Sequence, residues 1–114
     1  MNKVSMLNAN QKQFVKNVRI SFNDDDLVNE YHNNFQNWER VGEFYTDLSG
    51  IEACEYAYDL SNNPRMHNER KLIQGLSRTF SIGDVVEIVE FANDGFEEYR
   101  YYICLDMGWR EVNG

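Results

Sequence analysis

The stretch Phe80–Asp106, FSIGDVVEIVEFANDGFEEYRYYICLD, decides the fold of this chain. It opens with a run of β-forming residues over Val85–Phe91 and continues, after a turn, with a segment that alternates between two faces. Residues 93–95, Asn-Asp-Gly, give a strong hairpin signal because these residue types tolerate positive φ. Gly108 permits a second turn, so Trp109–Val112 is expected to pair as a short final strand. The C-terminal third therefore predicts a three-stranded antiparallel meander.

Two strands and a helix are predicted upstream of this meander. Val15–Phe22 alternates near its end and is typical of a half-buried strand. The spacing of apolar residues predicts a helix over Asp25–Phe35, with acids in its first turn that suit the helix dipole. Trp38–Tyr45 is ambiguous, and we favour a strand there. One face of that strand would carry Trp38, Arg40, Gly42 and Phe44.

The clearest helix signal is the pattern S-x-x-E at residues 49–52, which has the form of a capping box. It predicts a helix over Gly50–Leu60 that stops before Pro64. Pro64–Ser77 is polar and mostly basic, and we expect it to be a mobile connection. The inner stripe of the helix would consist of Ile51, Cys54, Ala57 and Tyr58. The outer face would carry an acidic stripe of Glu52, Glu55 and Asp59.

Length and composition favour a single folded unit over residues 1–114. Hydrophobic residues make up 42% of the chain and aromatic residues 14%, which is enough to form a buried core. Together with the predicted elements, this indicates an α+β fold. We expect an antiparallel sheet of about five strands that packs on one or two helices.

The net charge of −8 is distributed in blocks along the chain. Residues 1–19 carry +4 and residues 65–78 carry +3, whereas residues 20–64 carry −9 and residues 79–114 carry −6. This balance argues against a protein that binds nucleic acid or anionic lipid directly, because both need clustered Lys and Arg. Two interpretations stay open: a solvated surface that maintains solubility, and an acidic face presented to a basic groove on a partner.

Catalytic and metal-binding motifs are not recognisable in the sequence. His32 and His67 stand in polar stretches without a nucleophile motif nearby, so we expect no enzyme activity. The triple aspartate at residues 24–26 lacks the spacing of a calcium loop, so we expect no metal and no cofactor. Cys54 and Cys104 are expected to be buried free thiols. No apolar run reaches the roughly 18 residues of a membrane span, and no apolar signal core follows Met1, which favours a cytoplasmic protein.

Three short motifs carry a family resemblance. They are Ser-Ile-Gly-Asp-Val-Val at residues 81–86, Tyr-Tyr-Ile-Cys at 101–104 and Gly-Trp-Arg-Glu-Val at 108–112. With the preceding helix, they make the region Trp38–Val112 resemble the YodL-like domain, and residues 1–37 lie outside the match. That resemblance implies a small protein of phages, plasmids or other mobile elements, with no catalytic residue to transfer. The motif positions that we interpret as structural are Ser81, Gly83, Asp84, Tyr101, Tyr102, Gly108 and Trp109.

These observations lead to two functional hypotheses. The first is a non-enzymatic anti-defence inhibitor, of the anti-CRISPR or anti-restriction type, that occupies the basic groove of a nucleic-acid-handling enzyme in a bacterial host. The second is an accessory or assembly domain of a mobile element without an inhibitory role. A homodimer through an exposed sheet edge is compatible with either. The candidate contact residues are Asp24, Asp25, Asp26, Glu30, Glu52, Glu55, Asp59, Asp94, Glu97 and Glu98.

Overall fold

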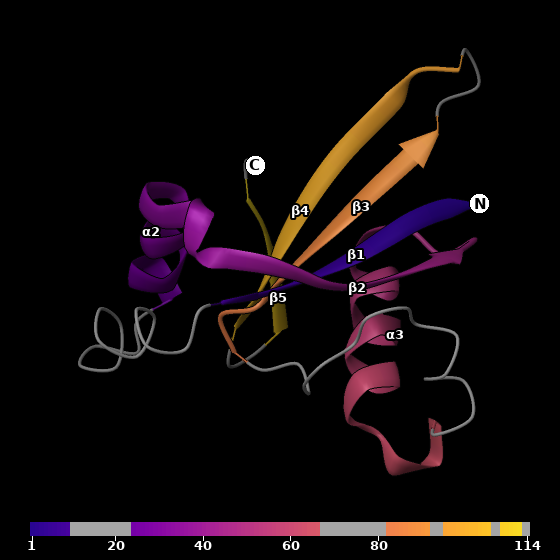
Figure 1. Ribbon diagram of the computed structural model, residues 1–114, viewed down its shortest axis with the longest axis horizontal. Coiled ribbons are helices and arrows are strands. Elements are labelled where there is room, and N and C mark those ends of the chain that lie inside the picture. Colours follow the sequence, from indigo (N-terminus) through magenta and orange to yellow (C-terminus); the bar gives the residue numbers. More distant parts are fainter. Residues whose placement is uncertain (10–23, 67–81, 92–94, 106–107, 113–114) are drawn as a thin grey trace.

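The computed structural model describes residues 1–9, 24–66, 82–91, 95–105 and 108–112. Five strands form one antiparallel sheet in the order β2-β1-β3-β4-β5, and two α-helices pack on it (Figure 1). This arrangement confirms the predicted α+β fold. In chain order the elements are β1 (Asn2–Ala9), α2 (Asp24–Asn34), the 3-10 turn η1 (Phe35–Asn37), β2 (Trp38–Thr46), α3 (Gly50–Asn62), the 3-10 turn η2 (Pro64–Met66), β3 (Val85–Phe91), β4 (Glu97–Leu105) and β5 (Gly108–Val112).

The predicted C-terminal meander is confirmed by the pairing of β3 with β4 and of β4 with β5. Val86 lies opposite Tyr102, and Tyr102 lies opposite Glu111 on the next strand. Gly95 has φ +86° in the first turn, and Gly108 has φ +129° in the second. Both values lie where side chains are rarely accommodated, which is the reason for glycine at these positions. Asn93 and Asp94 lie outside the described residues.

Strand β1, which lies between β2 and β3, was not predicted from the sequence. It pairs with β2 on one side and with β3 on the other, although it carries polar residues along its length. Val4 and Met6 point into the core and are 0% exposed. Asn2 Nδ2 donates to the carbonyl of Leu48 at 2.9 Å, which fixes the start of β1 beside α3. The strand predicted over Val15–Phe22 lies outside the described residues.

The two helices cover opposite faces of the sheet. Helix α3 packs on a cluster that includes Val86 and Tyr102, whereas α2 packs on a cluster that includes Val85 and Ile103. Since neighbouring residues of a strand point to opposite faces, these two clusters lie on opposite sides. We call these sides the α3 side and the α2 side. Figure 1 also shows the β3–β4 hairpin extending beyond both helices.

One predicted strand face is wrong. Trp38, at one end of β2, belongs to the α2-side cluster, whereas Phe44, near the other end, belongs to the α3-side cluster. The cause is a register shift: Met6 pairs with Gly42, but the next residue of β1 pairs with Arg40. The extra residue is a β-bulge, which reverses the faces on either side of it.

Helix α3 occupies the predicted place, but its inner stripe differs from the prediction. Ile51 and Tyr58 are 50% and 43% exposed, respectively. Cys54 and Ala57 are buried as expected, and the stripe is completed by Ala53, Leu60 and Ser61. Ser49 is the N-cap residue with an extended backbone, yet its side chain makes no capping hydrogen bond, so the predicted capping box is wrong. Of the predicted mobile connection, residues 64–66 form the turn η2, and the remainder lies outside the described residues.

Candidate functional site

The predicted acidic stripe of α3 is solvent-exposed. Glu52, Glu55 and Asp59 all lie on the outer side of the helix, away from the buried residues. Asp59 accepts a hydrogen bond from Asn63 Nδ2 at 3.0 Å at the end of the helix. The stripe therefore presents its carboxylates to solvent from one continuous helical surface.

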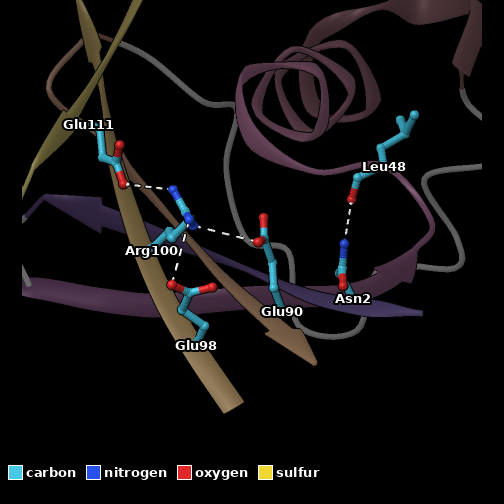
Figure 2. Close-up of polar contacts among 6 residues, drawn as sticks. All are labelled: Asn2, Leu48, Glu90, Glu98, Arg100 and Glu111. Carbon is cyan, nitrogen blue, oxygen red and sulfur yellow. Dashed lines mark hydrogen bonds and ion pairs between the residues drawn. The ribbon is translucent and has the colours of Figure 1, made fainter. Parts of the chain in front are cut away.

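A second group of acids lies on the α3 side of the sheet, around Arg100 (Figure 2). The guanidinium nitrogens of Arg100 lie 3.5 Å from Glu90, 3.6 Å from Glu98 and 3.4 Å from Glu111. These carboxylates raise the pKa of Arg100, with Glu98 the largest cause and Glu90 the next. One cation is thus shared among three anions, so the cluster keeps a negative charge. The "acidic surface" below means this cluster and the α3 stripe: Glu52, Glu55, Asp59, Glu90, Glu98, Glu111 and Arg100.

The structure does not bring the three predicted acidic sets together. The acids of α2 lie on the other side of the sheet: Asp25 pairs with Arg110 at 3.0 Å, and Glu30 accepts a hydrogen bond from Asn34. Asp24 is half-buried. Glu97 also points to the α2 side, where it accepts the hydroxyl of Tyr99 at 2.6 Å. The side chain of Asp26 and all of Asp94 lie outside the described residues.

The residues of the family-like motif occupy structural positions where the structure describes them. Gly83 has φ +92°, and its N–H donates to the carbonyl of Cys104 at 2.8 Å. Asp84 is 1% exposed, and its carbonyl accepts the N–H of Cys104 at 2.9 Å. Tyr101 and Tyr102 point to opposite sides, and Trp109 packs against the α3-side cluster. Ser81 lies outside the described residues.

A pocket of about 330 Å³ opens between α3, the end of β4 and the start of β5. Tyr58 and Trp109 meet in it nearly at right angles, with an interplanar angle of 84° and ring centroids 6.5 Å apart. Glu55 of the acidic stripe lines the same pocket. The described residues that line it are Glu55, Tyr58, Ile82, Cys104, Leu105, Gly108 and Trp109.

The two cysteines are buried free thiols, as predicted. Burial is the main cause that raises the pKa of both, and the pKa of Cys104 reaches about 12 with a further contribution from Asp84. Both thiols are therefore protonated at neutral pH and are weak nucleophiles, because the thiolate is the reactive form. The Cys104 thiol consequently contributes an uncharged wall to the pocket.

The α2 side carries a polar cluster instead of a continuous apolar layer. Arg40 Nη2 lies 3.0 Å from Glu87, and Arg40 Nη1 donates to Ser5 Oγ at 3.0 Å. Burial and a hydrogen bond to Glu87 raise the pKa of Tyr101 to about 12, so this hydroxyl keeps its proton at neutral pH. Only 8% of the Glu87 side chain is exposed, so its carboxylate is largely shielded from solvent.

Sequence reasoning missed Glu90, Arg100, Glu111 and the pocket. The register of the strands is the signal that could have indicated the acidic cluster. Glu90 lies opposite Glu98, and Tyr102 lies opposite Val86 on one neighbouring strand and opposite Glu111 on the other. A hairpin with a fixed turn determines those pairs, so its register could have placed the acids together. Among the residues that the structure describes, no three side chains of His, Cys, Asp or Glu lie close enough together to hold a metal ion.

Comparison with family models, with curated proteins and with solved structures gave no match for this chain. The resemblance to the YodL-like domain thus stays a prediction from the motif residues. No helix among the described residues is long and apolar enough to cross a membrane.

Proposed function

We propose that this protein is a non-enzymatic anti-defence inhibitor of a phage or other mobile element, acting in the cytoplasm of a bacterial host. Its target would be a host enzyme that handles nucleic acid, such as a CRISPR effector or a restriction enzyme. The acidic surface would occupy the basic groove in which that enzyme holds its nucleic acid. The mobile-element origin is taken from the motif resemblance, and the mechanism is taken from the charges.

The observation that supports this mechanism is the gathering of carboxylates on the α3 side. The stripe Glu52, Glu55 and Asp59 contains no cation, and Arg100 is shared by three carboxylates of the sheet. A surface of this sign attracts Lys and Arg side chains and competes with phosphates for them. The acids of α2 lie on the opposite side, so the inhibitor would approach its target with the α3 side only.

The proposal is tested with a variant that loses only the charges of the stripe. Glu52→Gln, Glu55→Gln and Asp59→Asn together change the net charge from −8 to −5. We expect the wild-type protein to block DNA binding by a CRISPR effector or restriction enzyme in a salt-sensitive manner, and the variant to lose about tenfold in potency. Inhibition of DNA binding by purified enzymes provides the measurement.

A matched control places the same charge change on the α2 side. Asn29→Lys, His32→Lys and Asn33→Lys, at three exposed positions of α2, also bring the net charge to −5. This control should inhibit as well as the wild type. The mechanism is contradicted if the stripe variant inhibits as strongly as the wild type, or if the protein itself binds DNA tightly. If cells that produce the protein stay fully protected by their restriction and CRISPR systems, the anti-defence role is contradicted.

A second candidate function, an assembly domain, is favoured by exposed aromatic residues on the α2 side. Tyr45 and Tyr99 are 59% and 53% exposed, and the strand pairing aligns them in one row with Lys3 and Val89. The row ends on the edge strand β2. Self-association through this row predicts a dimer in sedimentation experiments that Tyr45→Ser dissociates. A monomer at every concentration contradicts this candidate.

A further inference from the structure

The pocket between α3, the end of β4 and the start of β5 combines three features of a cation site. Two aromatic rings, Tyr58 and Trp109, form a corner, and the negative faces of such rings attract cations. Glu55 supplies a carboxylate at the same pocket, and among the described residues that line it Glu55 carries the charge. The volume of about 330 Å³ lies near the lower end of the range of ligand pockets, roughly 300–1,000 Å³.

The remaining walls suit an aliphatic chain that leads to the cation. Ile82 and Leu105 are apolar, and the thiol of Cys104 is uncharged at neutral pH. A long basic side chain has this composition, with an aliphatic stem and a charged end. Arginine fits better than lysine because its planar guanidinium both stacks on aromatic rings and donates in a fork to a carboxylate.

We infer that this pocket binds an arginine side chain of the protein that the acidic surface contacts. The occupant is assigned by charge complementarity and by continuity: Glu55 belongs both to the pocket and to the exposed stripe with Glu52 and Asp59. The identity of the partner as a host enzyme rests on the proposed function. The recognition of arginine rests on the pocket itself.

The test uses two peptides that differ only in charge. One is acetyl-Gly-Gly-Arg-Gly-Gly-amide, and the other has citrulline, a neutral analogue, in place of arginine. The two tryptophan indole N–H signals of the ¹⁵N-labelled protein report on binding, and Trp109→Phe assigns them. Trp38 serves as an internal reference because its indole N–H is buried and donates to the carbonyl of Gly83 at 2.9 Å. We expect the arginine peptide to shift the Trp109 signal saturably, with an affinity at least about fivefold above that of citrulline.

Two single substitutions on one helix separate the pocket from the surrounding charge. Glu55→Gln should lower the affinity for the arginine peptide about three- to fivefold, whereas Glu52→Gln, which lies outside the pocket lining, should change it less than about twofold. Both residues are exposed, so neither variant should unfold the protein. An unmoved Trp109 signal, equal binding of citrulline or equal effects of the two variants would overturn the inference.

The outcomes also distinguish this inference from the proposed function. Arginine-peptide binding without inhibition of any host enzyme leaves the pocket assignment standing and removes the anti-defence role. Inhibition that Glu55→Gln and Glu52→Gln weaken equally leaves the acidic surface standing and removes the pocket assignment.

Discussion

The two sides of the sheet share the same strands but are built differently. The α3 side buries a continuous apolar cluster and places its charges at the rim, where Arg100 and the α3 stripe face solvent. The α2 side is apolar only at the end that α2 covers. In its middle the α2 side buries Glu87 under Arg40, and beyond that it exposes Tyr45 and Tyr99.

This difference separates stability from binding. A buried apolar cluster contributes to the free energy of unfolding in proportion to the surface it removes from water. Charges at its rim contribute little to stability but produce a field that steers a basic partner. On the α3 side the two roles belong to different residues, so we expect that the exposed charges of the stripe can be changed there without damaging the fold.

The largest expected effect comes from the same substitution on the two sides of β3. Val86 is 0% exposed in the α3-side cluster, whereas Val89 is 6% exposed and faces the other side. We expect Val86→Ala to lower the free energy of unfolding by about 2–3 kcal/mol, from lost burial plus a cavity, and Val89→Ala by about 1 kcal/mol. Urea unfolding measures both values. Equal losses would show that the two sides are equally well packed.

The same contrast explains what the sequence could predict. The meander and α3 were predictable because turn residues and apolar spacing are local signals, read from a few neighbouring residues. Strand β1 was missed although Val4 and Met6 alternate with polar residues as in a half-buried strand. Its burial depends on pairing with both β2 and β3, which no local signal shows. The acidic stripe was predictable from helical spacing. The cluster around Arg100 was not, because it needs the register of three strands at once.

High pH should lower the free energy of unfolding through the two buried thiols of the α3 side. Burial raises the pKa of Cys54 and Cys104 in the folded protein, whereas an unfolded thiol titrates near pH 8.5. Above that pH the unfolded state loses protons that the folded state keeps, so stability falls as pH rises. By about pH 9.5 the expected loss is ~1 kcal/mol per thiol.

This window lies below about pH 10, where a tyrosine of the unfolded chain titrates, so Tyr101, whose pKa burial raises to about 12, contributes little to the slope here. Urea unfolding between about pH 7.5 and 9.5 measures the slope. The double variant Cys54→Ala and Cys104→Ala should lose most of the pH dependence, whatever its stability at pH 7. An undiminished slope in the variant would assign the effect to other groups.

The polar cluster of the α2 side should contribute less to the free energy of unfolding than the apolar cluster of the α3 side. Arg40→Met leaves the carboxylate of Glu87 buried without its counter-charge, and we expect a loss of about 1–2 kcal/mol. That value is reduced from the cost of a fully buried pair because 47% of the Arg40 side chain is exposed. Adding Glu87→Gln should restore part of the loss. Lys3→Met, which breaks the more exposed pair with Glu43 at 3.3 Å, is the control and should cost less than about 0.5 kcal/mol.

The smallest effect on stability should come from Arg100→Gln at the rim of the α3 side. The three carboxylates around Arg100 would then repel one another, so the variant should unfold at a slightly lower urea concentration. Since salt screens this repulsion, the difference from the wild type should shrink between about 0.05 and 0.5 M salt. Arg110→Gln breaks the pair with Asp25 on the α2 side and should show a weaker salt dependence. If both variants respond to salt alike, the carboxylates around Arg100 do not act as a group, and the acidic surface reduces to the stripe on α3.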